Sequence, residues 1–263
     1  MRQYSTSYTI GFSAAVCVVC SLLVSSAAVG LRARQLQNIE LDRKRNVLMV
    51  AGFIEPTEIP SAEQIDALFE RIEQVVVDRV TGEETDISPD GFDQQVVASD
   101  LDMSQRAPAN AAGVRRLPDY VLVYKVYEDD RLDQVVIPIE GMGLWSTLYG
   151  FLSLDSDGRT IRGITFYEHA ETPGLGGEID NPRWRERWEG RLAYDDQWEP
   201  RIEVIKGRAG PPQEDPFHVD GLSGATITAR GVGHLVQFWL GENGLGPYLA
   251  QLRERGELGE DGE

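Results

Sequence analysis

Residues 220–228 read DGLSGATIT and lead directly into an apolar run with helical spacing. Two glycines and an alanine in this stretch leave little side-chain bulk around the hydroxyl of Thr226, so a large group can approach the backbone. The helix predicted to follow presents unpaired N–H groups and the positive end of its dipole, which suit a phosphate. The alternative is an ordinary helix start, where Ser, Thr and Asp side chains compete to cap the helix.

A second glycine-rich segment, residues 171–177, reads ETPGLGG and lies between a predicted strand and a predicted helix. Three glycines in four positions permit a tight loop whose N–H groups can face a ligand. The segment is neither a dinucleotide fingerprint nor a P-loop, because it lacks the spacing of the first and the G-K-[S/T] of the second. An ordinary glycine loop is the alternative.

Several segments together resemble the C subunit of the Na⁺-translocating NADH:quinone reductase. Besides SGAT at 223–226 and ETPGLGG, they are GMGLWST at 141–147, GITFYEH at 163–169 and FWLGE at 238–242. In that family, FMN is joined through its phosphate to the hydroxyl of the Thr that ends SGAT, which is Thr226 here. The resemblance covers most of the chain and implies a flavoprotein with a phosphoester-linked FMN.

The resemblance also assigns roles around Thr226. Asp220 belongs to the pattern that a Mg²⁺-dependent flavin transferase recognises when it moves FMN from FAD onto the threonine. Ser223 and Thr228 are the competing hydroxyls. The expected FMN-binding residues are Thr226, Ser223, Gly224, Ala225, Asp220, Glu171, Thr172, Gly174, Leu175, Gly176, Trp145 and Lys206.

Four of these residues have a specific expected contact. Thr172 would bond the ribityl chain or the polar edge of the ring, and Leu175 would cover an isoalloxazine face. Trp145 can stack on a flavin, although Trp is more often a packing residue. Lys206 can neutralise a phosphate or a reduced ring, with a solvated lysine as the alternative. Trp184, Trp188 and Trp239 are expected to be packing residues.

The implied function is electron transfer from NADH towards ubiquinone within a Na⁺-exporting complex. NADH oxidation and quinone reduction would take place on other subunits (A, B, D, E and F), so no catalytic residue is expected on this chain. One alternative is the related G subunit of an Rnf-type electron-transport complex. Another is an anchored binding module without flavin.

Composition limits the other possibilities. The net charge of −18 argues against a nucleic-acid partner, which requires a basic surface. Both cysteines, Cys17 and Cys20, lie in the apolar N-terminal segment, so the rest of the chain has no disulfide, Cys-ligated zinc or iron–sulfur cluster. The three histidines are scattered, and no metal site is expected.

Residues 8–31 are apolar and long enough to cross a membrane as a helix. The alternative is a cleaved signal peptide, since small residues lie near Ala27. Five basic residues follow the span and only Arg2 precedes it, so the positive-inside rule places the C-terminal part in the cytoplasm. The resemblance instead implies a single-pass protein of the bacterial inner membrane with a periplasmic domain, and we follow it.

The expected fold class is α+β, because strands and helices are mixed without a βαβ repeat. A capping box at Ser61 predicts a helix through Ile72, and residues 75–80 predict a strand. Residues 81–116 are expected to have little structure. The later elements are strands at 120–126, 134–139 and 201–206, a hairpin of 148–154 with 160–166, and helices at 182–189, 226–240 and 247–255. The expected domains are an anchor (1–34), a helical and loop connecting region (35–118), an FMN-binding domain (119–256) and an acidic tail (257–263).

Overall fold

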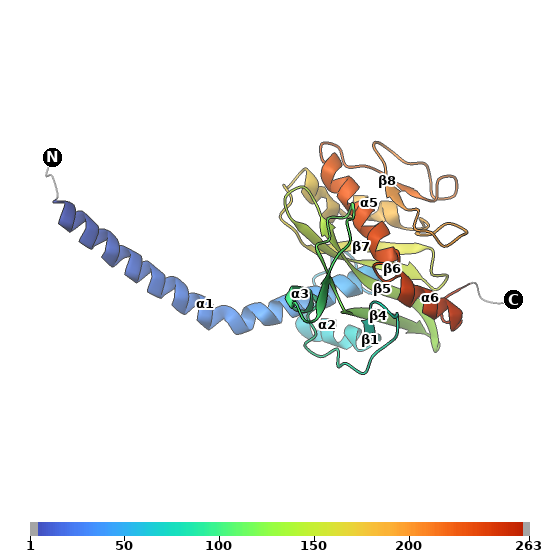
Figure 1. The fold of residues 1–263 in the computed structure, drawn as a ribbon, viewed down its shortest axis with the longest axis horizontal. Coiled ribbons are helices and arrows are strands. Elements are labelled where there is room, and N and C mark those ends of the chain that lie inside the picture. The colour runs from blue at the N-terminus through green and yellow to red at the C-terminus, as the bar shows by residue number, and fades with distance from the viewer. Residues whose placement is uncertain (1–4, 260–263) are drawn as a thin grey trace. The chain divides into compact units, whose positions relative to one another are not determined.

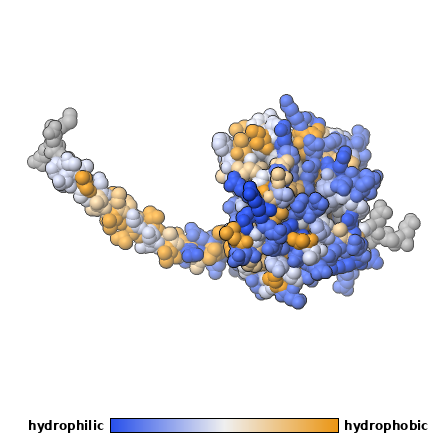
Figure 2. All heavy atoms as spheres, in the orientation of Figure 1, coloured by the Kyte–Doolittle hydropathy of each residue, from blue (hydrophilic) through white to orange (hydrophobic). Residues whose placement is uncertain are grey.

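The apolar N-terminal segment is part of one long helix, α1 (Thr6–Val50), in a computed structural model that describes residues 5–259. The chain divides into two compact units, Met1–Arg43 and Lys44–Glu263. The first contains a helical stretch long and apolar enough to cross a membrane, and none of that stretch is buried in protein (Figure 2). This fits the expected single-pass anchor. Arg2 and the last four residues of the acidic tail lie outside the described residues.

An antiparallel sheet of five strands forms the centre of the second unit, in the order β1-β4-β5-β6-β7 (Figure 1). Strands β4 to β7 are consecutive neighbours, and β1 pairs with β4 at the edge. The hairpin expected from residues 148–166 is confirmed as β6 and β7. The strands are β1 (Ile72–Asp78), β4 (Tyr120–Glu128), β5 (Arg131–Met142), β6 (Thr147–Asp155) and β7 (Ile161–Glu168).

One face of the sheet packs against α5 (Thr226–Leu240), whose bounds are those expected from the sequence. Val232, Leu235 and Val236 of this helix are fully buried, and they share one core with alternate residues of the strands such as Ile137. The following helix, α6 (Gly246–Glu254), adds buried apolar residues to the same core. The sheet therefore fixes the position of α5 and of its first residue.

The opposite face is covered by the end of α1 and by α2 (Ala62–Phe69). Val47 and Leu48 of α1 are fully buried. A row of ring contacts crosses this face from Phe69 to Tyr124 to Phe151, with centroid separations of 5.9 and 5.7 Å. Burial of aromatic and aliphatic side chains on both faces is the main stabilising term of the fold.

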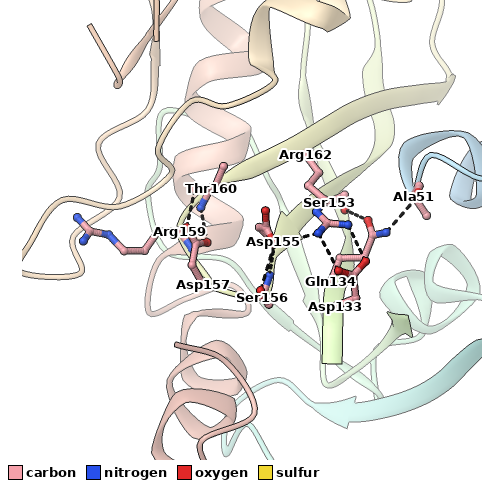
Figure 3. Close-up of polar contacts among 10 residues, drawn as sticks. All are labelled: Ala51, Asp133, Gln134, Ser153, Asp155, Ser156, Asp157, Arg159, Thr160 and Arg162. Carbon is pink, nitrogen blue, oxygen red and sulfur yellow. Dashed lines mark hydrogen bonds and ion pairs between the residues drawn. The ribbon is translucent and has the colours of Figure 1, made fainter. Parts of the chain in front are cut away.

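Several polar side chains near this face are paired with one another (Figure 3). The Gln134 amide donates to the carbonyl of Ala51, just after α1, at 3.0 Å, and accepts from the hydroxyl of Ser153 at 2.6 Å. The Arg162 guanidinium donates to Asp133 at 2.6 and 2.8 Å and to a second aspartate at the end of β6. The bond to Ala51 joins the end of α1 to the sheet, and the Arg162 bonds link β5, β6 and β7.

Three expectations about local structure are wrong. Residues 81–116 contain α3, capped by Asp93, and β2, which pairs with β3. Ile72 opens β1 instead of ending a helix, and the predicted strand at 201–206 shortens to β8. Elements this short carry too few residues to show a period in the sequence. The remaining elements are α3 (Gln94–Ser99), β2 (Ser104–Arg106), β3 (Arg116–Pro118), η1 (Gly176–Asp180), α4 (Pro182–Arg185), η2 (Glu186–Trp188), β8 (Glu203–Val204) and β9 (His218–Val219).

Leu48→Ala is expected to lower the free energy of unfolding of the second unit by about 3 kcal/mol, because it leaves a cavity in a fully buried site. Denaturant unfolding followed by tryptophan fluorescence measures this loss. Leu36→Ala, on the exposed part of α1, is the matched control and should change it by less than about 0.5 kcal/mol. Equal effects of the two variants would show that the end of α1 does not belong to the core.

Glu140, on β5, provides a prediction about pH. Its carboxylate lines a groove with Tyr149 and has no hydrogen-bond or ion-pair partner within residues 5–259, and burial raises its pKa from 4.5 to about 7. The folded protein then holds this proton more tightly than the unfolded chain, so stability falls as pH rises from about 4.5 to about 7. Glu140→Gln is expected to remove this dependence and to stabilise the protein by about 2–3 kcal/mol at pH 8.

Thermal or denaturant unfolding at pH 5 and pH 8 checks the prediction. The exposed Glu128→Gln is the control for removing one charge from the acidic chain. A gain of the same size in both variants would assign the effect to net charge instead of burial.

Candidate functional site

The site begins at the first residue of α5. Thr226 is exposed, and its hydroxyl has no hydrogen-bond partner within residues 5–259. Ala225 before it is buried and provides no side-chain cap, so the N–H groups of the first turn have no capping side chain. Gly224 has φ +75°, a backbone conformation that favours glycine. The sequence predicted this combination of free hydroxyl, small neighbours and helix start.

Of the two competing hydroxyls, only one is accessible. Thr228 is fully buried, and its Oγ1 donates to Oε2 of Glu171 at 2.5 Å. Ser223 is exposed on the turn before α5. Burial therefore excludes Thr228 as an attachment point, while Ser223 stays open.

Glu171 brings the two glycine-rich segments together. It is buried, and Oε1 accepts from the backbone N–H of Trp145 at 2.8 Å and of Ser146 at 3.4 Å, while Oε2 accepts from Thr228. A Cβ at Gly143 or Gly176 would lie 2.6 or 2.4 Å from this carboxylate, so both glycines are needed for its close enclosure. Glu171 was expected to contact the cofactor, but its carboxylate is used inside the fold.

The segment 171–177 forms a tight loop beside Thr226. The N–H groups of Leu175 and Gly177 both donate to the carbonyl of Thr172 at 3.0 Å, and Gly174 has φ +76°. Leu175 is exposed, and its Cδ2 lies 3.1 Å from where a Cβ of Gly224 would be. The loop therefore lies close to the turn that precedes α5, and its residues Leu175 and Thr172 are exposed.

Apolar side chains gather next to these two loops without being buried. They come from the loop before β6, the 171–177 loop and the first turn of α5. Trp145 is 66 % exposed, which excludes a packing role, whereas the other three tryptophans expected to pack are buried. Exposed apolar residues this close together indicate a binding face. They are Leu144 (42 % exposed), Trp145, Leu175 (46 %) and Ile227 (61 %).

Thr226 also lines a groove of about 660 Å³. Its walls are residues 203–208 and 220–224 with the first turns of α5. Lys206 lines it as expected, together with Arg208 and Arg230. Glu203 and Asp220 line it as well, so the three cations leave the lining with one net positive charge. In a chain with net charge −18, such a groove beside a hydroxyl suits an anionic ligand.

The motifs alone did not single out four residues near Thr226. Leu144 and Ile227 belong to the exposed apolar group, and Arg208 and Arg230 line the groove. Each is one to four residues from a residue that was named, so proximity to the motifs is the signal that could have found them. The remaining expected residue, Asp220, lies in the wall of the groove, where its Oδ1 accepts from the N–H of Ala209 at 2.9 Å.

Comparison with known proteins identifies the family of the chain. Residues 143–241 match the family described as FMN-binding domain. The chain is 48 % identical over 243 residues to the C subunit of the Na(+)-translocating NADH-quinone reductase of Yersinia pestis, covering 91 % of this chain and 90 % of the relative. It is 44 % identical over 258 residues to the corresponding subunit of Pseudomonas aeruginosa, covering 96 % and 98 %. The chain belongs to this C-subunit family.

Solved structures of C subunits share the fold. The crystal structure of NqrC from Shewanella oneidensis has 31 % sequence identity and a TM-score of 0.73, covering 81 % of this chain and 97 % of that chain. The C-subunit structure from Parabacteroides distasonis has 26 % identity and a TM-score of 0.64, covering 83 % and 96 %. The resemblance to the C subunit and the α+β fold class are thus confirmed, and the Rnf-type alternative is not favoured.

Thr228→Val is expected to lower the free energy of unfolding by about 2–3 kcal/mol, because it leaves one oxygen of the buried Glu171 carboxylate without its donor. Thr226→Val makes the same chemical change two residues earlier, where the hydroxyl has no partner, and should cost less than about 0.5 kcal/mol. Denaturant unfolding of both variants measures the difference. Equal losses would mean that the bond between Thr228 and Glu171 does not stabilise the site.

Proposed function

We propose that Thr226 carries FMN as a phosphoester, and that the chain is the membrane-anchored electron-transfer subunit of a Na⁺-translocating NADH:quinone reductase. The observation that carries the proposal is the exposed hydroxyl of Thr226 at the start of α5, which has no hydrogen-bond partner among residues 5–259. Exposed apolar side chains lie on the neighbouring segments, and Thr226 lines a groove with three cations. FMN has the same two-sided chemistry, with an apolar ring system at one end and a phosphate at the other. When bound, it supplies one-electron steps between neighbouring redox centres.

The residues present suit such a group. Lys206, Arg208 and Arg230 are placed to balance the charge of a phosphodiester on Thr226, and the α5 N–H groups add to the favourable potential. Leu175 and Trp145, both exposed, can shield a flavin ring from water. During attachment, the Thr226 hydroxyl would displace AMP from FAD at the flavin-side phosphorus and lose its proton to the transferase.

The chain would work only within its complex. NADH oxidation and quinone reduction are assigned to other subunits (A, B, D, E and F), and a periplasmic flavin transferase would load Thr226 before or during assembly. We place the protein in the bacterial inner membrane as a single-pass subunit with residues 119–256 as the FMN-binding domain on the periplasmic side. The basic residues after the span favour the opposite side by the positive-inside rule, but a maturation enzyme in the periplasm requires this one.

Thr226→Ala is expected to abolish covalently bound flavin, because it removes the proposed attachment atom. It should leave the fold unchanged, because that hydroxyl makes no hydrogen bond within residues 5–259. The protein is co-expressed with its flavin transferase, and the denatured polypeptide is examined for flavin fluorescence and intact mass. Ser223→Ala is the matched control, since it removes the other exposed hydroxyl of the same turn, and it should keep the flavin.

Two outcomes would contradict the proposal. Flavin retained in Thr226→Ala and lost in Ser223→Ala would move the attachment to the serine. Wild-type protein whose mass equals that of the sequence, from a host that contains the transferase, would favour an anchored module without flavin.

A further inference from the structure

The Asp220 side chain is largely buried, although Asp220 belongs to the motif that the flavin transferase is expected to recognise. Its Oδ1 accepts from the N–H of Ala209 at 2.9 Å, and only 17 % of the side chain is exposed. Its carbonyl accepts from the indole N–H of the buried Trp184 at 2.8 Å. Arg187 lies 3.9 Å from the other carboxylate oxygen. Little of this carboxylate is left for an enzyme to contact.

The bond to Ala209 is the last of a series. Residues 203–207 and 217–221 run side by side as the parallel pair β8 and β9 and its extension, and β8 lies beside α5 (Figure 1). The backbone bonds of this series are Glu203 N–H to Phe217 O at 2.8 Å, Ile205 N–H to Val219 O at 3.0 Å and Gly221 N–H to Gly207 O at 2.9 Å. After them, the Asp220 side chain takes the place of a backbone acceptor and extends the pairing to Ala209.

The extension of the pairing to Ala209 matters because residues 206–208, which precede Ala209, line the groove beside Thr226. Lys206, Gly207 and Arg208 are exposed and form one wall of the groove beside Thr226, while residues 220–224 form the other. Gly207 has φ +99°, so this wall passes through a residue with few conformational restrictions. The bond from Ala209 to Asp220 joins the two walls on the far side of this glycine, and it therefore holds Arg208 in place between two fixed points.

We infer that Asp220 is a positioning residue that shapes the groove beside Thr226. It accepts a hydrogen bond from the N–H of Ala209 and so holds the Lys206–Arg208 wall, and the transferase does not recognise its charge. The inference rests on the proposed attachment of FMN to Thr226. A positioning role can be distinguished from recognition of the Asp220 charge, because a substitution can keep the hydrogen-bond acceptor and remove the charge.

Asp220→Asn keeps an acceptor oxygen for Ala209 and removes the charge, whereas Asp220→Ala removes both. The initial rate of covalent flavin attachment is measured for each full-length variant with purified transferase and FAD. Asp220→Asn is expected within about twofold of wild type, and Asp220→Ala about tenfold slower or worse, the effect of losing one hydrogen bond to a charged acceptor. Glu214→Gln, an exposed charge on the loop between the two strands, is the control and should not change the rate.

Hydrogen exchange of the Ala209 amide supplies a readout that does not depend on the transferase. It should be slow in wild type and Asp220→Asn and fast in Asp220→Ala. Ala209→Pro tests the same bond from the other side, because it removes the donor and leaves the carboxylate more exposed. A positioning role predicts slow flavin attachment for this variant, and recognition of the charge predicts attachment at the wild-type rate or faster.

The inference is overturned if Asp220→Asn is as slow as Asp220→Ala while its Ala209 amide stays protected, since the charge itself would then be required. It is also overturned if Asp220→Ala keeps a protected Ala209 amide, because another contact would then hold the wall. Wild-type protein that takes up no flavin at all would instead contradict the proposed function, so the two failures are distinguishable.

Discussion

The enclosed carboxylate of Glu171 is the interaction on which the site depends. It accepts hydrogen bonds from the loop before β6 and from the first turn of α5, and it sits on the third segment itself. Hydrogen bonds to a charged acceptor are worth about 1.5–3 kcal/mol each, and a buried carboxylate that loses a donor is costly. The three segments are therefore fixed relative to one another as a unit.

Because α5 is held in this position, one threonine of its first turn faces the interior and the other faces solvent. Thr228 points inward to Glu171, and Thr226, two residues earlier, is left on the outside without a partner among residues 5–259. The same helix is held along its length by the sheet, since its apolar face shares one core with the strands. The Thr226 hydroxyl is thus presented at the start of a fixed helix, beside exposed apolar side chains and the groove that Lys206 lines.

The second unit includes the last residues of α1. Residues 44–51 of the chain belong to the core of the second unit, where Val47 and Leu48 are buried and Gln134 binds the carbonyl of Ala51 (Figure 3). The segment that leaves the anchor is therefore part of the folded domain and not a free linker.

Local features of the sequence determined much of the secondary structure and the position of the candidate site. The helix 226–240, the β6–β7 hairpin, the capping box at Ser61 and the apolar span were all predictable, because caps, turns and hydrophobic periods depend on residues close together in the sequence. So was the position of Thr226 among small residues at the start of a helix, which is visible in the motif. Only the tertiary structure decided which polar side chains turn inward. Glu171 meets donors 26 and 57 residues away, and Asp220 meets a donor 11 residues away, so no local pattern could show that both serve the fold first. The same holds for β1, which joins the sheet through a partner strand some 50 residues later in the chain, because strand pairing depends on distant residues and not on sequence neighbours.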